Sequence, residues 1–354
     1  MRIEERVKSL QLLAKLLKTK DKEELPSEIR PLWEKWEEAV EREHCYHSWF
    51  IPDFVREAAS ALSRMMLGED GHALERWIGM YLPELKTKSN THRIGVIMAG
   101  NIPLVAFHDL LCVYMAGDVF VGKMSSHDTR LWPLLVEMLT ALCPEAASHF
   151  ELTQDRLGAV DAVIATGSDN STRYFSHYFG SKPHIFRGHC NGVAVLDGKE
   201  SAAELQGLAA DICLYFGMGC RNVSKVYVPE SYDFTPLFQE MESYRPLLGM
   251  HHSYLNNLEY QKTVHLINSL PFLDQGICMF KAETAAASPV GVVHYEYYTE
   301  VGKVWESLRS DAIQCVATHL SAPVESVPLG QTQYPMLHQY ANAKDTMRFL
   351  LSVS

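Results

Sequence analysis

The chain has 354 residues, of which 47% are hydrophobic and 21% are charged, and its formal net charge is −11. Single hydrophobic cores stop growing before about 300 residues, so a two-lobed enzyme is expected. No stretch approaches the roughly 20 apolar residues that a membrane helix needs, and the acidic excess argues against a nucleic-acid surface. We expect a soluble protein with no membrane span and no nucleic-acid partner.

The N-terminal stretch and the cysteines indicate the compartment. The sequence MRIEERVKSLQLLAKLLKTKDKEEL is charged and periodic, without the apolar core and small-residue cleavage site of a signal peptide. The eight cysteines are scattered, with no CxxC pair and no His/Cys spacing of a zinc site. These patterns predict a cytoplasmic protein with free thiols, one or two of which carry chemistry, and no metal site.

Residues 1 to about 85 have helical periodicity. Apolar side chains recur on one face at Val7, Leu10, Leu13, Leu16 and Leu17, and again at Trp33, Trp36 and Val40. Pro26 and Pro31 separate the two segments. The pattern predicts a helical layer over a sheet.

From Arg93 onward the sequence changes to short apolar runs bounded by turn-forming residues. The runs are IGVIMAG, DVFVGK, AVDAVIATG, GVAVLDG, KVYVP and VGVVHYEYY. Helically spaced segments lie between them, namely LWPLLVEMLTALC, NSTRYFSHYF and AAELQGLAADICLYF. Continuous apolar runs alternating with helices are typical of buried parallel strands. We predict the α/β class with two open sheets, a domain boundary after residue 193, and a segment 321–354 that returns to the first domain.

The segment RIGVIMAGNIPLVAF, residues 93–107, reads as a buried strand, a turn and a helix. Asn101 lies in the turn. Its side-chain amide is suited to donate to a reacting carbonyl oxygen, which is the task of an oxyanion-hole donor. Alternatively, Asn101 caps the following helix through its side-chain oxygen.

Two further strand ends carry polar groups. The stretch AGDVFVGKMSS ends a strand with Lys123, and AVIATGSDNSTRYF ends another with Gly167 and Ser168 before a helix. A Gly-Ser turn at a helix N-terminus offers free N–H groups to a phosphate. The GxGxxG and GxxxxGK[ST] fingerprints are absent, so an ordinary turn and a solvated lysine stay as alternatives.

The segment YFGMGCRNVSKVYVP, residues 215–229, contains the candidate nucleophile Cys220. Gly217 and Gly219 flank Met218 and allow a sharp turn that leaves the thiol exposed in a cleft. The alternative is that Cys220 is a small buried hydrophobic residue, which is the commoner role of a lone cysteine.

These pieces, in this order and at these spacings, resemble the aldehyde dehydrogenase superfamily. Within it, the chain looks most like the acyl-CoA reductases of the luminescence fatty-acid reductase type, the LuxC-like family. The matching motifs are Gly100-Asn101-Ile102-Pro103, Gly122-Lys123, Thr166-Gly167-Ser168 and Phe216-Gly217-Met218-Gly219-Cys220-Arg221, between residues 93 and about 230. The first 85 residues and the C-terminal third contain none of these motifs and match only in their general pattern of apolar and polar residues.

The resemblance implies a role for each motif. Asn101 supplies the oxyanion donor, Lys123 binds the adenosine ribose, the Gly167-Ser168 turn meets the pyrophosphate, and Cys220 is the nucleophile. Residues 1–193 then hold the nicotinamide cofactor, and residues 194–320 form the catalytic domain. The resemblance also implies a homo-oligomer.

One departure from the superfamily pattern concerns the fate of the acyl-enzyme. Oxidising members carry a Glu in an E-L-G-G-K segment that activates water, and its position in HIFRGHCNGVAVL falls near Phe186. Without that base the thioester survives to meet hydride or coenzyme A. His189 is an alternative base, although a lone His beside Cys190 is more often structural.

The resulting prediction is reduction of an acyl thioester to an aldehyde through an acyl-enzyme on Cys220. The donor is an acyl-CoA or an acyl-carrier protein, with a fatty acyl group. NADPH is expected, with NADH as the alternative, because Ser126 stands where many NAD-preferring relatives carry a Glu. Ser125, Ser126 and Lys123 are able to donate hydrogen bonds to a 2′-phosphate. A competing reading is that the two serines only start the next helix.

Two other functions fit the same residues. A cofactor-free cysteine acyltransferase or thioesterase would use His177, His184 or His189 as its base. A non-catalytic scaffold of the same fold would keep Cys220 in its core. Turnover without nicotinamide distinguishes the first, and thiol labelling distinguishes the second, because an activated and exposed Cys220 reacts ahead of the other cysteines.

Overall fold

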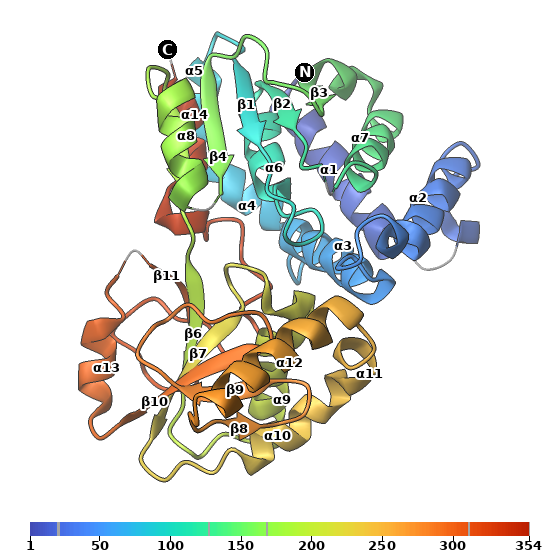
Figure 1. The fold of residues 1–354 in the computed structure, drawn as a ribbon. Helices are drawn as coiled ribbons and strands as arrows, with labels where there is room; N and C mark the ends of the chain where they lie inside the picture. Colours follow the sequence, from blue (N-terminus) through green and yellow to red (C-terminus); the bar gives the residue numbers. More distant parts are fainter. Residues whose placement is uncertain (20–21, 127, 168, 311, 354) are drawn as a thin grey trace. The chain divides into compact units, whose positions relative to one another are not determined.

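The computed structural model describes residues 1–19, 22–126, 128–167, 169–310 and 312–353 (Figure 1). The chain forms two compact units, unit 1 with residues 1–188 and 336–354 and unit 2 with residues 189–335. The limits expected from the sequence were after residues 193 and 320. Residues 321–335 stay in unit 2 because Val327 bridges to Ala317 and Thr332 binds Asp211.

Unit 1 begins with a helical layer. Its members are α1 (Ile3–Lys18), η1 (Lys22–Glu24), α2 (Arg30–Arg42), η2 (Glu43–Cys45), α3 (Pro52–Leu67), α4 (Ala73–Gly79) and α5 (Leu82–Thr87). The predicted apolar face is buried, since Leu10 and Leu13 of α1 are 0% exposed. Proline occupies the first turn of α2, α3 and α5, where its missing N–H has no helical partner to lose.

A parallel five-stranded sheet follows in unit 1. Its strands are β1 (Arg93–Ile97), β2 (Val119–Lys123), β3 (Phe150–Thr153), β4 (Ala162–Thr166) and β5 (His184–Arg187), in the order β3-β2-β1-β4-β5. The connections are α6 (Phe107–Ala116), α7 (Leu131–Leu142), η3 (Pro144–His149) and α8 (Asp169–Phe179). The strand order reverses between β1 and β4, which makes this position the topological switch point of the sheet.

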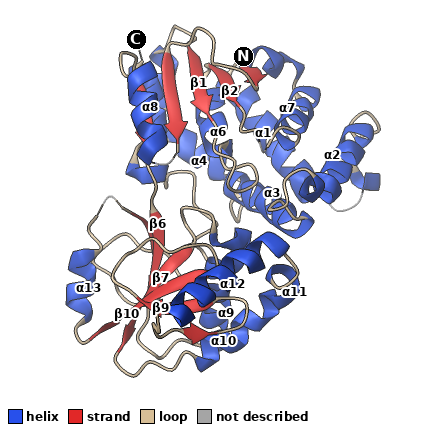
Figure 2. Cartoon of the chain, in the orientation of Figure 1, coloured by secondary structure: helices blue, strands red, loops and turns tan. Residues whose placement is uncertain are grey.

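Side chains alternate between the two faces of this sheet, as the period of a strand requires. Val163 and Ala165 of β4 pack against Phe175 and Phe179 of α8. The intervening Ile164 faces the main core of the unit, which includes side chains of α1, α6 and α7. The sheet therefore lies between α8 and the other helices of the unit (Figure 2).

The C-terminal segment completes unit 1. It contains η6 (Ala341–Ala343) and α14 (Thr346–Ser352), and Met347 and Leu350 are 0% exposed in the core of that unit. Arg187 donates to the Thr346 hydroxyl at 2.8 Å through Nη2, and its Nη1 donates to both carboxylate oxygens of Asp109 at 2.9 and 2.7 Å. This buried network attaches the end of the chain to β5 and α6.

Unit 2 contains a six-stranded sheet. Its strands are β6 (Asn191–Val195), β7 (Val223–Pro229), β8 (Leu273–Asp274), β9 (Met279–Ala282), β10 (Val292–Tyr298) and β11 (Ile313–Ala317), in the order β11-β6-β7-β10-β9-β8. The short β8 pairs antiparallel with β9, and the other pairs are parallel. The helices are α9 (Ala202–Cys213), η4 (Leu214–Gly217), α10 (Thr235–Met241), η5 (Glu242–Tyr244), α11 (Arg245–Leu248), α12 (His252–Ile267) and α13 (Val301–Ser307).

The predicted α/β class with two largely parallel sheets and an N-terminal helical layer is confirmed. Each sheet is flanked by helices, so its strands are buried on both faces and read as continuous apolar runs. Within the described ranges, none of the helices has both the length and the apolar character needed to cross a membrane.

Candidate active site

The backbone before Cys220 has an unusual conformation. Tyr215, Phe216 and Gly217 have φ values of 53°, 58° and 72°, so three consecutive residues are left-handed. Each non-glycine residue in this region costs about 1 kcal/mol, which the surroundings must offset. Phe216 is 1% exposed, and its ring lies 4.4 Å from that of His251 and 5.5 Å from that of Tyr254. Aromatic packing therefore holds the reversal that leads into Cys220.

Asn222 fixes the same loop from its other side. Its side-chain oxygen accepts from the Gly219 N–H at 2.8 Å, and its amide donates to the carbonyls of Asp211 and Leu214 at 2.9 Å each. The residue is 2% exposed, so water does not compete for these groups. Asn222 thus joins the end of α9, the glycine turn and the start of β7.

A buried carboxylate anchors a distant segment beside the loop. Asp211 accepts from the Gly330 N–H at 2.6 Å, and from the Thr332 N–H at 3.0 Å and hydroxyl at 2.7 Å. Burial raises the pKa of Asp211 to about 6, and these hydrogen bonds oppose the rise. Arg221, the neighbour of Cys220, donates to the Thr332 carbonyl. The loop that carries the thiol is consequently tied to residues 330–332.

The Cys220 thiol is half-buried, whereas the sequence predicted that it would be exposed. Burial raises its pKa, and the backbone N–H groups of Cys190 and of Cys220 itself act in the opposite direction by favouring the thiolate. Among the described residues, the exposed thiol is that of Cys45. Burial therefore disfavours the Cys220 thiolate more than these two backbone N–H groups favour it.

The other predicted residues gather at one edge of the unit 1 sheet. Asn101 follows β1, Lys123 ends β2 and Gly167 follows β4. Ile97 pairs with Lys123 on one side and with Ala165 on the other, so the three strands end in the same row. This is the carboxyl edge at the topological switch point, where open α/β sheets bind their ligands.

Two alternative interpretations are wrong, namely that Asn101 caps the helix after β1 and that Ser125 and Ser126 start the helix after β2. Helix α6 begins at Phe107 with Ala106 as its N-cap, so Asn101 does not cap it. Helix α7 begins at Leu131, and the loop that carries Ser125 and Ser126 ends before it. The described serines therefore lie in the loop after β2, Ser125 half-buried and Ser126 exposed.

Contacts with nearby residues fix the positions of Lys123 and Gly167. The Lys123 amine donates to the carbonyls of Met124 and Gln154, both at 3.3 Å. A Cβ on Gly167 would lie 2.8 Å from the Ser171 Cβ, so the close approach of α8 to the end of β4 requires glycine here. The predicted phosphate-binding Ser168 lies outside the described residues.

The sequence resemblance predicts that the water-activating Glu of oxidising relatives would fall near Phe186. Phe186 is 9% exposed in β5, and its ring stacks on His184 at 4.0 Å and 17°. Of the histidines considered as a base, His177 on α8 and His184 belong to unit 1. His189, the first residue of unit 2, is exposed.

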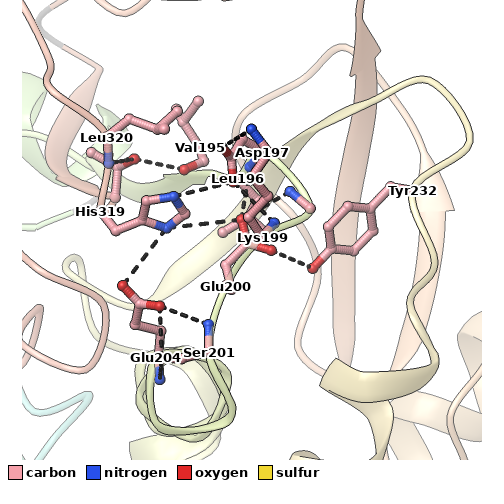
Figure 3. A network of polar contacts seen from close by, with 12 residues as sticks. Val195, Leu196, Asp197, Lys199, Glu200, Ser201, Glu204, Tyr232, His319 and Leu320 are labelled. Atoms are coloured by element: carbon pink, nitrogen blue, oxygen red, sulfur yellow. Dashed lines mark hydrogen bonds and ion pairs between the residues drawn. The ribbon is translucent and has the colours of Figure 1, made fainter.

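A polar network that the sequence did not reveal lies at the carboxyl ends of β6 and β11 (Figure 3). Ring nitrogens of His319 lie 3.1 Å from Asp197 Oδ1 and 4.0 Å from Glu200 Oε1. Glu200 accepts from the N–H groups of Asp197 and Gly198 and from the Tyr232 hydroxyl. The donor set is of a kind that binds divalent metals, but both ring nitrogens already face carboxylates. More than a hundred residues separate Glu200 from His319, so no local sequence pattern marks this network.

Comparison with solved structures identifies the class of the fold. Aldehyde dehydrogenase 21 from Physcomitrella patens matches with a TM-score of 0.67 and 11% identity, over 99% of this chain and 84% of that chain. A putative aldehyde dehydrogenase from Burkholderia cenocepacia matches with a TM-score of 0.60 and 12% identity, over 91% and 76%. KauB from Pseudomonas aeruginosa matches with a TM-score of 0.60 and 15% identity, over 91% and 72%. The chain has the aldehyde dehydrogenase fold.

The family within that fold follows from sequence comparison. The acyl-CoA reductase (LuxC) family matches residues 54–243, which is more than half of the chain. A search of curated proteins found no match. The chain belongs to the acyl-CoA reductase (LuxC) family, whose members are oxidoreductases acting on acyl and aldehyde groups.

Proposed function

We propose that the chain reduces an acyl thioester to an aldehyde with NADPH, through an acyl-enzyme on Cys220. The donor is an acyl-CoA or acyl-carrier-protein thioester, with a fatty acyl group. The observation that carries the proposal is the Cys220 loop, in which three left-handed residues and Asn222 fix the glycine turn that leads into a half-buried thiol. Membership of the acyl-CoA reductase family supports the same substrate class.

The first step is transfer of the acyl group to the enzyme. The Cys220 thiolate attacks the thioester carbonyl, and the C–S bond to the carrier breaks. The carrier thiolate leaves and takes up a proton. The Cys220 N–H and the Asn101 side chain donate to the oxyanion while it exists. The pairing of Asn101 with Cys220 is part of the proposal.

The carboxyl edge of the unit 1 sheet has residues that fit a nicotinamide dinucleotide. The switch point lies between β1 and β4, Gly167 allows close approach at the start of α8, and Lys123 is fixed at the end of β2. The loop after Lys123 offers Ser125 and Ser126, and Ser126 stands where many NAD-preferring relatives carry a Glu that would repel a 2′-phosphate. When bound, the nicotinamide supplies hydride.

The second step returns the acyl group as an aldehyde. Phe186, buried in β5, replaces the carboxylate that activates water in oxidising relatives, so the acyl-enzyme is kept for reduction. The thioester carbon on Cys220 accepts the hydride, and the resulting thiohemiacetal takes up a proton. Its C–S bond then breaks, which releases the aldehyde and restores the thiol. We further propose that the enzyme works in the cytoplasm as a homo-oligomer.

Incubation with a panel of acyl-CoAs tests the function directly. Nicotinamide absorbance and aldehyde are followed together, with NADPH and NADH in parallel. Loss of reduced cofactor that matches the aldehyde formed supports the proposal. Release of free coenzyme A without nicotinamide, at the same rate as with it and with no aldehyde, would indicate a thioesterase or acyltransferase instead.

A further inference from the structure

The first turn of α12 packs on the backbone reversal that leads into Cys220. His251 is the N-cap of α12 and is 9% exposed, and its ring centroid lies 4.4 Å from that of Phe216. Tyr254, in the same turn and 3% exposed, has its ring centroid 5.5 Å from that of Phe216. The proposed mechanism uses neither His251 nor Tyr254, and each has a hydrogen bond that fixes its ring.

A hydrogen bond to the helix backbone sets the orientation of the His251 ring. Its Nδ1 accepts from the Tyr254 N–H at 3.1 Å, one of the N–H groups that a helix leaves without a partner in its own first turn. A ring nitrogen that accepts carries no hydrogen, so the neutral ring keeps its hydrogen on Nε2. The cap therefore determines both the tautomer of His251 and the tilt of 42° at which its ring meets Phe216.

The Tyr254 ring is fixed at its polar end. Its hydroxyl donates to the Ile277 carbonyl at 2.7 Å, in the chain just before β9. The capping hydrogen bond joins His251 to the Tyr254 backbone, so the two rings act together on Phe216. We call this pair of rings the α12 clamp. The start of α12 and the chain before β9 hold the α12 clamp in place.

Phe216 is the middle one of the three left-handed residues before Cys220. Its φ of 58° is in a region that a bulky residue occupies only where its surroundings determine it. The α12 clamp is part of those surroundings, since Phe216 is 1% exposed and both rings contact it. Asn222 accepts from the Gly219 N–H at the other end of the turn. The turn from Phe216 to Cys220 is therefore fixed at both ends.

We infer that His251 is a positioning residue for Cys220, and that it acts through its ring contact with Phe216 and not through its cap of α12. The ring contact keeps Phe216 left-handed, and the conformation of Phe216 determines where the Cys220 sulfur lies when the thioester arrives. A misplacement of about 1 Å is enough to slow a reaction about 10²-fold. The inference rests on the proposed role of Cys220 as the nucleophile.

Two variants separate the ring from the cap. His251→Asn keeps a side-chain oxygen that accepts from the Tyr254 N–H and removes the ring, whereas His251→Phe keeps a ring against Phe216 and removes the acceptor. Each variant loses one stabilising contact, so we expect Tm to fall by about 2–5 °C in both. Acylation by acyl-CoA should slow about ten-fold or more in His251→Asn and stay within about two-fold of the wild type in His251→Phe.

Alkylation by iodoacetamide follows the Cys220 thiol without reference to acyl transfer. The wild-type thiol is half-buried, so a turn that has lost its ring contact should expose it. Peptide mass spectrometry should show Cys220 alkylated about ten-fold faster in His251→Asn and at the wild-type rate in His251→Phe. The buried cysteines of the same unit are the internal control, because unfolding of the unit would expose all of them together; they are Cys190, Cys213, Cys278 and Cys315.

Failure of the proposed function and failure of this inference give different results. If the wild type forms no acyl adduct, the proposed function fails, and the alkylation rates still decide whether His251 positions Cys220. The inference is overturned if Cys220 is alkylated at one rate in all three proteins, or if His251→Phe loses as much acylation as His251→Asn. If either variant does not fold, His251→Ser replaces the first and His251→Tyr the second, because serine caps a helix without a ring and tyrosine supplies a ring without an acceptor nitrogen.

Discussion

Asn222→Ala tests whether the loop around Cys220 is held by the network described above. The substitution removes an acceptor for the Gly219 N–H and a donor to the carbonyls of Asp211 and Leu214. The site is 2% exposed, so water replaces these partners poorly. Alanine also leaves space next to the turn. Both the stability of unit 2 and the position of the thiol should change.

The magnitude follows from the number of groups affected. Each buried polar group left without its partner costs about 1–3 kcal/mol. The low end applies here, because carbonyls can accept twice and the turn can relax, so the three hydrogen bonds sum to about 3 kcal/mol. Relaxation of the left-handed Tyr215 and Phe216 returns about 1 kcal/mol each at most and moves Cys220. We expect a net loss of about 1–3 kcal/mol and acylation slowed by about ten-fold or more.

Urea unfolding and the rate of acyl adduct formation measure both effects on the same preparation. Asn257→Ala is the matched control, because Asn257 is exposed on α12 and its amide donates to the Ser253 carbonyl at 2.8 Å. That change should stay within about 0.5 kcal/mol, with normal acylation. An Asn222→Ala protein whose stability and acylation both match the control would refute the account of the loop.

Three other substitutions give distinct results. Asn101→Ala should lower turnover by about 10²-fold with little change in Tm, since Ala106 and not Asn101 caps α6; near-normal turnover would exclude the oxyanion role. Ser126→Glu should shift kcat/KM from NADPH towards NADH, and a wild type that strongly prefers NADH would contradict this assignment. Burial raises the pKa of Asp211 from 3.8 to about 6, so its contribution to stability is present below about pH 4 and is lost as pH rises through 6. Asp211→Asn should abolish that slope in the unfolding free energy, and a slope equal to that of the wild type would show that another group causes it.

The fold could be predicted from sequence where burial dictates the pattern. Six strands lie in the apolar runs from IGVIMAG to VGVVHYEYY because helices cover both faces of each sheet. Helix α12 was not predicted, since its buried positions include the polar Lys262 and His265, which conceal the apolar face. The short β8 and the partly polar β11 were missed for the same reason.

The site was predictable where the local sequence determines geometry. Glycines marked the loop of Cys220, and strand ends marked Asn101 and Lys123. The role of Asn222 depends on how α9 ends, because its amide donates to carbonyls 8 and 11 residues earlier, and no sequence motif marks these contacts. The half-burial of Cys220 likewise arises only in the folded loop.

The central claim is that Cys220 carries the acyl group. Intact-mass spectrometry of the wild type and of Cys220→Ala, after exposure to acyl-CoA without nicotinamide, tests it most directly. The account predicts one acyl adduct on the wild type, none on the variant, and release of that adduct as aldehyde when NADPH is added. An adduct that persists in Cys220→Ala, or one that NADPH does not discharge as aldehyde, would contradict it.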